Sequence, residues 1–187
     1  SLLGIVYISL SMMWLTAIRS WDYMYSALKD SALVHSGIFN SWLEENNLQN
    51  DYTLWIIMAI FISIWTCDSA AYFVGRKFGK NKLFPIHSPK KSWEGAIAGF
   101  IFGTLTFWGV INYFVPQFST IHALIIGLIV ASIGQIGDLA ESQLKRSADV
   151  KDSSNLIPGH GGFLDRFDSV VFVMPFVFIY LMIITIW

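Results

Sequence analysis

Five long apolar runs, separated by charged segments, constrain the fold of this chain more than any other feature. They cover about residues 2–18, 54–74, 95–115, 121–139 and 170–187, and each approaches the ~20 residues that a helix needs to cross a bilayer core. The runs lack the alternating polarity of a membrane β-barrel, and backbone in lipid must satisfy its own hydrogen bonds. The sequence is 55% hydrophobic and 13% charged, whereas soluble domains are nearer ~45–50% and ~25%. We therefore predict an all-α, polytopic transmembrane bundle of about five helices, forming a single membrane-embedded domain over residues 1–187.

The chain begins with Ser1 and has neither a methionine nor a basic segment at its start. We therefore expect no cleavable signal peptide and an N-terminally incomplete chain. The single cysteine, Cys67, excludes an internal disulfide. Because Cys67 lies in an apolar run with no adjacent histidine, we expect a buried and inert thiol.

Most of the basic residues fall in two of the loops, which we place at residues 76–93 and 142–168. Six of the 12 Lys and Arg residues lie in the first loop and four in the second. The 19–51 loop has two basic residues, and the turn at 116–120 has no charge. Because short loops rich in Lys and Arg stay in the cytoplasm, both basic loops are predicted to face it, in an inner or plasma membrane.

Small residues recur at helical spacing in the third and fourth apolar runs. Gly95, Gly99 and Gly103 are four residues apart, as are Gly127 and Ala131. Such ridges let membrane helices approach closely. We predict that the ridge starting at Gly95 packs within the bundle, with a homodimer interface as the alternative.

Asp68 is a carboxylate inside the second apolar run. A charged group in a membrane span is costly and marks a functional site or a buried ion pair. Arg76, two turns further along the chain, is the candidate for a purely structural partner. We favour the functional interpretation, in which Asp68 and Arg76 both contact a substrate.

A Ser-Pro-Lys-Lys-Ser-Trp-Glu-Gly sequence leads into the third apolar run. Ser92 is predicted to cap the third helix, with Glu94 in its first turn. A helix N-terminus attracts anions, and Lys90 and Lys91 add positive charge beside it. We expect Ser88, Lys90 and Lys91 to bind phosphate; the alternative is that the lysines only fix the topology and contact lipid headgroups.

Acidic residues lie where the fourth helix is predicted to leave the membrane and the fifth to enter it. Asp138, Glu141 and Ser142 stand at i, i+3 and i+4, on one helix face, and Asp165 and Asp168 repeat the i, i+3 spacing. Mg²⁺ is bound by carboxylate oxygens together with substrate phosphates and water. We predict that Asp138, Asp165, Asp168 and Ser142 hold Mg²⁺; the alternative is that these aspartates cap helices or pair with nearby arginines.

The polar stretch between the fourth and fifth runs reads SQLKRSADVKDSSNLIPGHGGFLDRFD. A structureless connection of this length is usually functional or disordered, and its glycines allow the backbone to pass close to a ligand. The stretch resembles the signature of the phosphatidate cytidylyltransferase family, Ser-x-apolar-Lys-Arg, four residues, Lys-Asp, a short spacer and His-Gly-Gly-apolar-x-Asp-Arg-apolar-Asp. The matching residues are Ser142, Leu144, Lys145, Arg146, Lys151, Asp152, His160, Gly161, Gly162, Phe163, Asp165, Arg166, Phe167 and Asp168. The sequences around Asp68 and Ser88 are similar to the same family.

The resemblance implies a nucleotidyltransferase of phospholipid biosynthesis that condenses CTP with phosphatidate to give CDP-diacylglycerol and pyrophosphate. It implies the catalytic residues Asp138, Lys145, Arg146, Asp165 and Asp168, and the substrate-binding residues Asp68, Arg76, Ser88, Lys90, Lys91, Lys151, His160, Gly161, Gly162 and Arg166. Mg²⁺ is the implied cofactor, and the family allows a second, monovalent cation such as K⁺. We expect His160 to donate to phosphate or shape the turn, and we expect no nucleic-acid partner.

Two other functions are compatible with parts of this pattern. A CTP-dependent polyprenol kinase would use similar charges, but its pattern maps onto the chain less completely. An ion-coupled transporter would explain Asp68 and Asp138 as intramembrane carboxylates. It would not explain a charged loop that contains Gly-His-Gly-Gly.

Overall fold

The computed structural model describes residues 2–20, 51–84, 88–147 and 164–186. In chain order the elements are α1 (Leu2–Arg19), α4 (Asp51–Phe78), β1 (Lys82–Phe84), β2 (Ser88–Ser92), α5 (Trp93–Phe114), α6 (Thr120–Ser147) and α7 (Leu164–Ile186). Within these ranges, α4, α5, α6 and α7 contain segments long and apolar enough to cross a membrane. With α1, an 18-residue helix, they confirm the predicted all-α bundle of an integral membrane protein.

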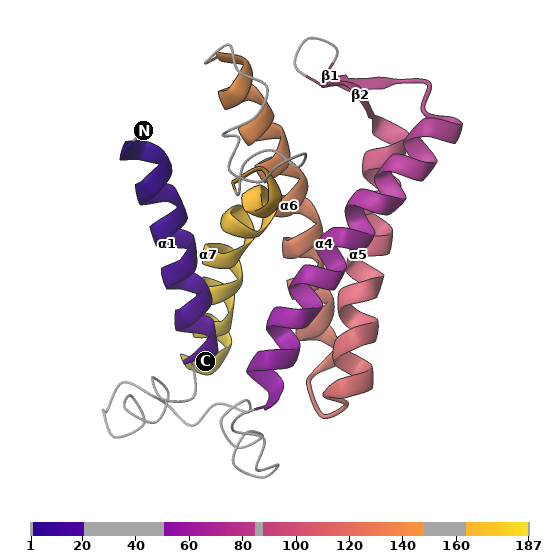
Figure 1. Cartoon of the computed structure of the whole chain (residues 1–187). Coiled ribbons are helices and arrows are strands. Elements are labelled where there is room, and N and C mark those ends of the chain that lie inside the picture. Colours follow the sequence, from indigo (N-terminus) through magenta and orange to yellow (C-terminus); the bar gives the residue numbers. More distant parts are fainter. Residues whose placement is uncertain (1, 21–50, 85–87, 148–163, 187) are drawn as a thin grey trace.

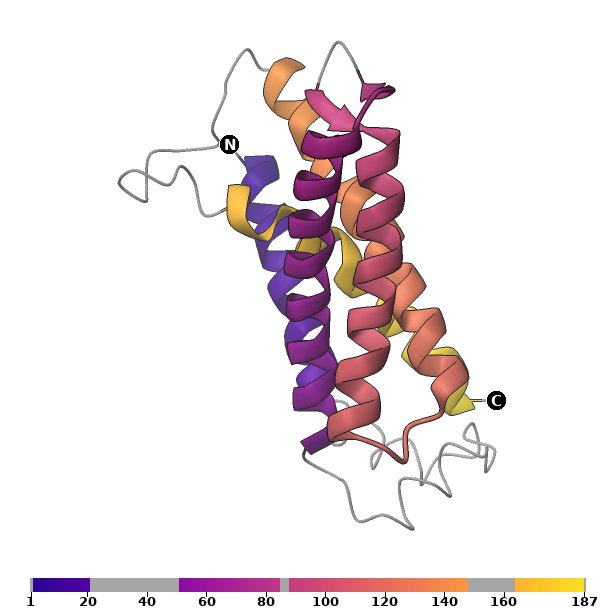
Figure 2. The same ribbon diagram turned by 90° about the vertical axis from the view of Figure 1, so that its right-hand side faces the viewer.

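The helices form a chain of neighbours in the order α1, α7, α6, α5 and α4 (Figures 1 and 2). Membrane helices that follow one another along the sequence run in opposite directions. The β1–β2 hairpin, the C-terminal end of α6 and the start of α7 therefore lie at the same end of the bundle, the top of Figure 1. The turn between α5 and α6 lies at the opposite end. The described parts of the two segments predicted as basic loops therefore lie on one side.

The glycine ridge of α5 packs against α4, as predicted for packing within the bundle. A Cβ added at Gly95 would lie 2.6 Å from the Ala71 carbonyl oxygen, and one at Gly99 would lie 2.8 Å from the Cys67 carbonyl oxygen. Ser63 donates to the Gly103 carbonyl at 2.7 Å and joins the same two helices. The close approach of α4 and α5 therefore depends on the absence of side chains along this ridge.

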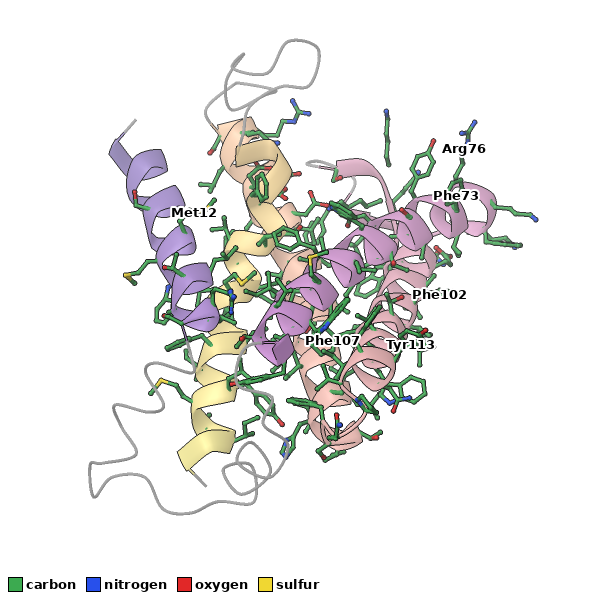
Figure 3. The ribbon with its side chains drawn as sticks, turned by 60° about the horizontal axis from the view of Figure 1, so that its bottom comes forward. Met12, Phe73, Arg76, Phe102, Phe107 and Tyr113 are labelled. Atoms are coloured by element: carbon green, nitrogen blue, oxygen red, sulfur yellow. The ribbon has the colours of Figure 1, made fainter. Side chains whose placement is uncertain are left out.

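Large apolar side chains divide between the interior and the outer surface of the bundle. Phe107 of α5 is fully buried and points between the helices, whereas Phe73, Phe102 and Tyr113 project outward (Figure 3). A surface of this composition suits contact with lipid, because lipid chains are as apolar as these side chains.

Helices α6 and α7 extend beyond the apolar runs that predict them. The fourth apolar run ends near residue 139, whereas α6 continues to Ser147, so the first residues of the predicted 142–168 loop are helical. The fifth run starts near residue 170, whereas α7 starts at Leu164. Charge alone indicated a loop, yet residues such as Glu, Gln, Leu, Lys and Arg are good helix formers. Both helices therefore extend beyond their apolar segments.

The predicted 76–93 loop also contains secondary structure. Helix α4 continues to Phe78, and β1 and β2 form an antiparallel hairpin in which Lys82 pairs with Ser92. Ser92 then caps α5, accepting the Gly95 N–H at 3.2 Å. The predicted N-cap and the position of Glu94 in the first turn are both confirmed. The sequence pattern missed the hairpin because its strands are short and rich in lysine.

Candidate functional site

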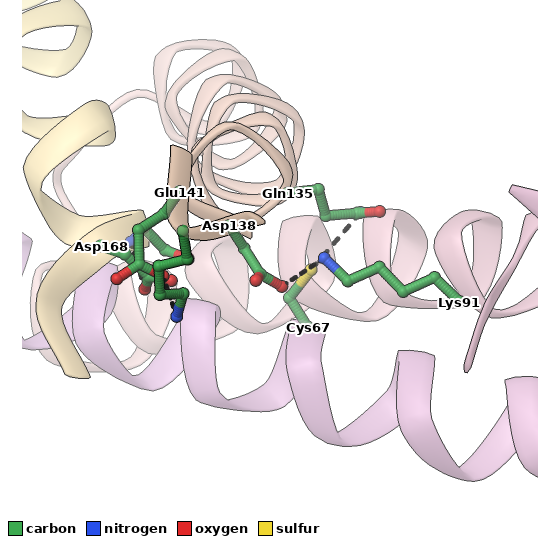
Figure 4. A network of polar contacts seen from close by, with 8 residues as sticks. Cys67, Lys91, Gln135, Asp138, Glu141 and Asp168 are labelled. Atoms are coloured by element: carbon green, nitrogen blue, oxygen red, sulfur yellow. Dashed lines mark hydrogen bonds and ion pairs between the residues drawn. The ribbon is translucent and has the colours of Figure 1, made fainter. Parts of the chain in front are cut away.

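A cluster of charged side chains from α6, α7 and β2 lies beside α4 (Figure 4). Helix α6 contributes Asp138, Glu141 and Lys145, which stand on successive turns of one face. Helix α7 contributes Asp168, and β2 contributes Lys91. Residues from three separate parts of the sequence therefore converge on one polar region.

The closest contact in this cluster joins the hairpin to α6. The Lys91 ammonium lies 2.5 Å from Oδ2 of Asp138, and the two side chains are 30% and 33% exposed. A partly buried ion pair of this kind is less screened by solvent than a surface pair. Lys91 thus neutralises Asp138 in this structure.

Glu141 is the most deeply buried carboxylate of the cluster. Its side chain is only 5% exposed, and Oε2 lies 2.8 Å from the ammonium of Lys145. The other oxygen, Oε1, is buried without a hydrogen-bond partner among the described residues. A buried acceptor without a donor is costly, so this oxygen marks a place where a cation or a proton donor is needed.

Asp168 faces Glu141 from the first turns of α7 (Figure 4). Its Oδ1 accepts the Ser169 backbone N–H at 2.6 Å. Asp168 lies close enough to Asp138 and to Asp68 of α4 for the three carboxylates to repel one another. The helices are thus packed so that like charges meet, which is unfavourable unless a cation or a shared proton joins them.

Gln135 holds α6 against its neighbours one turn before Asp138. Its Nε2 donates to the Ala96 carbonyl oxygen at 3.2 Å and lies 3.5 Å from Sγ of Cys67. The amide therefore joins α6 to both α5 and α4. Cys67 is buried, as expected for an inert thiol.

The carboxylates suit a hard divalent cation. If all are ionised, Asp68, Asp138, Glu141 and Asp168 outnumber the ammonium groups of Lys91 and Lys145 by two charges. No three His, Cys, Asp or Glu side chains form a ready-made metal cage within the described ranges. Mg²⁺ does not need one, because it is commonly held by one or two carboxylates with substrate phosphates and water. Asp138 and Asp168, on adjacent helices, meet that requirement, and the partnerless oxygen of Glu141 lies beside them.

The structure brings some of the predicted site residues together and separates others. Asp138, Asp168, Lys91 and Lys145 lie in the cluster, with Asp68 beside it. Arg76 instead lies on the exposed surface of α4, where its Nη1 donates to the Tyr72 hydroxyl at 3.1 Å (Figure 3). The structure therefore gives Arg76 a local partner in place of Asp68.

The remaining predicted residues lie at the same end of the bundle or outside the described residues. Ser88 and Lys90 are on β2, Ser142 is half-buried on α6, and Arg146 is exposed there. Asp165 and Arg166 belong to the first turn of α7. Lys151, His160, Gly161 and Gly162 lie outside the part of the chain that the structure describes.

The predicted site omitted two residues that the structure places at its centre. Glu141 had a signal in the sequence, since it shares a helix face with Asp138, but it was not assigned a role. Gln135 stands one turn before Asp138 on an apolar helix, and only the packing of α6 against α4 and α5 reveals its contacts. A polar side chain within an apolar membrane helix is the sequence signal that identifies such a position.

Comparison with known proteins places the chain beside cytidylyltransferases. A sequence model described as the cytidylyltransferase family matches residues 1–184. A phosphatidate cytidylyltransferase from Bacillus subtilis is 45% identical over 150 residues, which cover 79% of this chain and 55% of that protein. The resemblance inferred from the polar signature is therefore confirmed.

Two further relatives carry the same name. The phosphatidate cytidylyltransferase from Haemophilus influenzae is 41% identical over 145 residues, covering 75% of this chain and 50% of the relative. The one from Staphylococcus saprophyticus is 37% identical over 175 residues, covering 94% and 66% respectively. The chain thus spans between half and two thirds of the length of these relatives.

Proposed function

The chain belongs to the cytidylyltransferase family, and on that premise we propose that it condenses CTP with phosphatidate to give CDP-diacylglycerol and pyrophosphate. The phosphate oxygen of phosphatidate attacks the α-phosphorus of CTP. The bond between the α-phosphorus and the bridging oxygen to the β-phosphorus breaks, and pyrophosphate leaves with the electron pair. The names of the relatives support both substrates.

The observation that carries this proposal is the convergence of carboxylates and ammonium groups at one end of a membrane bundle. A lipid phosphate and a triphosphate are strongly anionic, and their reaction requires positioning and charge neutralisation rather than a covalent catalyst. Lys91 and Lys145 supply positive charge from two different elements. The apolar helices beside them suit a substrate whose acyl chains remain in the bilayer.

Asp138 and Asp168, together with Asp165 and Ser142, would hold Mg²⁺, which would supply charge neutralisation for the triphosphate. Lys145 and Arg146 of α6 bind phosphate oxygens at the end of the helix. Lys151, Arg166, His160, Gly161 and Gly162 complete the nucleotide site in this proposal. A monovalent cation such as K⁺ beside the same carboxylates would balance the negative charge that remains.

We place this site on the cytoplasmic side of an inner or plasma membrane. Ten of the 12 basic residues fall in segments 76–93 and 142–168, and the described parts of these segments share one end of the bundle. Positively charged loops are retained on the cytoplasmic side during membrane insertion. A site on this side can receive CTP from the cytoplasm.

The direct test is pyrophosphate release by the purified chain in detergent, measured with CTP, phosphatidate and Mg²⁺. We expect release that requires all three components, with CDP-diacylglycerol formed in equal amount. A polyprenol kinase would instead release CDP and phosphorylate an added polyprenol. An ion-coupled transporter would consume no CTP, so either result would replace the proposed reaction.

A further inference from the structure

Lys91 is held by a tightly packed connection between α4 and α5. A Cβ added at Gly79 would lie 2.5 Å from Oγ of Ser92, so this turn leaves no room for a side chain. Glu94 of α5 accepts from the Asn81 side chain at 2.9 Å. These contacts pack the backbone on both sides of the hairpin, and rotation of the Lys91 side chain alone is enough to move its ammonium away from Asp138.

The Lys91 ammonium occupies an oxygen that the proposed reaction assigns to the metal. It lies 2.5 Å from Oδ2 of Asp138, whereas Mg²⁺ binds carboxylate oxygens at about 2.0–2.1 Å. An ammonium and a divalent cation on the same oxygen would repel each other strongly. Asp138 therefore cannot keep this contact and also bind the metal through Oδ2.

We propose that Lys91 is the resting counter-ion of Asp138, that a divalent cation displaces it, and that the released ammonium then binds the nucleotide phosphates. This inference rests on the proposed function for the identity of the nucleotide. The pair is suited to exchange because both side chains are about one third exposed. A deeply buried pair, like that of Glu141, would pay a large desolvation cost on separation.

The exchange has a consequence that a fixed phosphate-binding lysine does not have. In the absence of nucleotide, Lys91 competes with the cation for Asp138, so its removal strengthens cation binding. In the presence of the cation, Lys91 is a phosphate ligand, so its removal weakens nucleotide binding. One substitution therefore changes the two affinities in opposite directions.

The test uses Mn²⁺ as the probe and measures free Mn²⁺ by electron paramagnetic resonance with the full chain in detergent. Without nucleotide, Lys91→Gln is expected to bind Mn²⁺ roughly tenfold more tightly, the scale of one charge-assisted contact. Lys82→Gln, which alters an exposed lysine of the same hairpin, should bind Mn²⁺ as the wild type does. Lys91→Arg keeps the charge and should also stay close to the wild type. With Mn²⁺ present, Lys91→Gln should bind CTP more weakly.

A second measurement uses the unmodified chain and does not depend on how a variant folds. Amine acetylation followed by mass spectrometry reports how available the ammonium of each lysine is. Mn²⁺ alone should increase the acetylation of Lys91 relative to Lys82, and CTP added with Mn²⁺ should reduce it again. Unchanged Lys91 acetylation, or unchanged or weaker Mn²⁺ binding by Lys91→Gln, would overturn the exchange.

These outcomes are separable from failure of the proposed function. If the same preparation released pyrophosphate but Mn²⁺ did not displace Lys91, the proposed reaction would be supported and the proposed exchange would be wrong. Mn²⁺-dependent release of Lys91 without any consumption of CTP would support the displacement and overturn the reaction. If Asp138→Asn bound Mn²⁺ as the wild type does, Asp138 would not be a ligand and the exchange would be wrong.

Discussion

The ammonium of Lys145 lies 2.8 Å from Oε2 of Glu141, one turn earlier on α6. Glu141 is nearly inaccessible and its second oxygen lacks a partner among the described residues. Lys145 therefore has two separable roles, as the counter-ion of a buried carboxylate and as a proposed ligand of the substrate phosphates.

Lys145→Ala is expected to destabilise the protein by about 3 kcal/mol, because it leaves the Glu141 charge buried and unpaired. The double variant Glu141→Ala, Lys145→Ala should recover most of this loss, since both charges are then removed. It should not recover pyrophosphate release. Thermal unfolding in detergent and the activity assay measure the two effects separately; recovered activity in the double variant would show that Lys145 has only the structural role.

Asp138→Asn and Asp165→Asn should each abolish most activity while the protein still folds and inserts. Each change keeps the shape of the side chain but removes a charge proposed to bind the metal. Loss of one metal ligand costs several kcal/mol of transition-state stabilisation, and each ~1.4 kcal/mol is about tenfold in rate. The rate of Mg²⁺-dependent pyrophosphate release should therefore fall by about a hundredfold or more.

Asp149→Asn is the matched control for these two variants, since Asp149 is not one of the fixed positions of the family signature. It should change the rate little. Near-normal turnover by Asp138→Asn together with loss of activity in Asp149→Asn would show that the metal site lies elsewhere.

Gly95→Ala and Gly99→Ala should each lower the free energy of unfolding by about 1–3 kcal/mol, the usual cost of overpacking. The added methyl group would meet backbone oxygens of α4 at 2.6 Å and 2.8 Å respectively, and backbone cannot rotate away. Gly109→Ala on the same helix has open space around its Cβ and should be tolerated. Thermal unfolding in detergent distinguishes them, and an equal loss at Gly109 would contradict the packing argument.

Transfer should proceed directly, without a covalent enzyme intermediate. The described part of the cluster contains carboxylates and ammonium groups, and the buried Cys67 lies in an apolar span. A chiral thio-CTP labelled at the α-phosphorus should therefore give CDP-diacylglycerol with inverted configuration. Net retention would require two displacements and an enzyme nucleophile.

Ser88 and Asp165 should lie on the same face of the membrane, and Asn47 should lie on the other. The hairpin and the start of α7 share one end of the bundle, whereas Asn47 precedes α4 and lies outside the described residues. Single cysteines at these positions, in a Cys67→Ser background, can be labelled from one side of sealed vesicles. Equal labelling of the Asn47 and Asp165 variants would contradict this topology.

Local sequence patterns were sufficient for several features of the fold. Hydrophobic runs predicted the membrane helices, because lipid leaves a buried backbone few structures other than the helix. Ser92 was identifiable as the cap of α5 because its side chain replaces a missing backbone acceptor within three residues. The spacing of Gly95, Gly99 and Gly103 predicted close helix packing, because residues four apart share one helix face and glycines there let a second backbone approach. Each of these signals lies within one continuous segment of the sequence.

The charged cluster depended on tertiary structure. Lys91 and Asp138 are 47 residues apart, and their contact exists because the long Lys91 side chain reaches from β2 to α6. The sequence was compatible with an ion pair between Arg76 and Asp68. In the folded protein the Arg76 side chain points outward from α4 and contacts Tyr72 instead. In the sequence, Glu141 is one of several charged residues near a helix end. Its burial follows only from the packing of the helices. The sequence determined which groups were available, whereas helix packing decided which of them meet, because electrostatic interactions depend on distance and burial and not on separation along the chain.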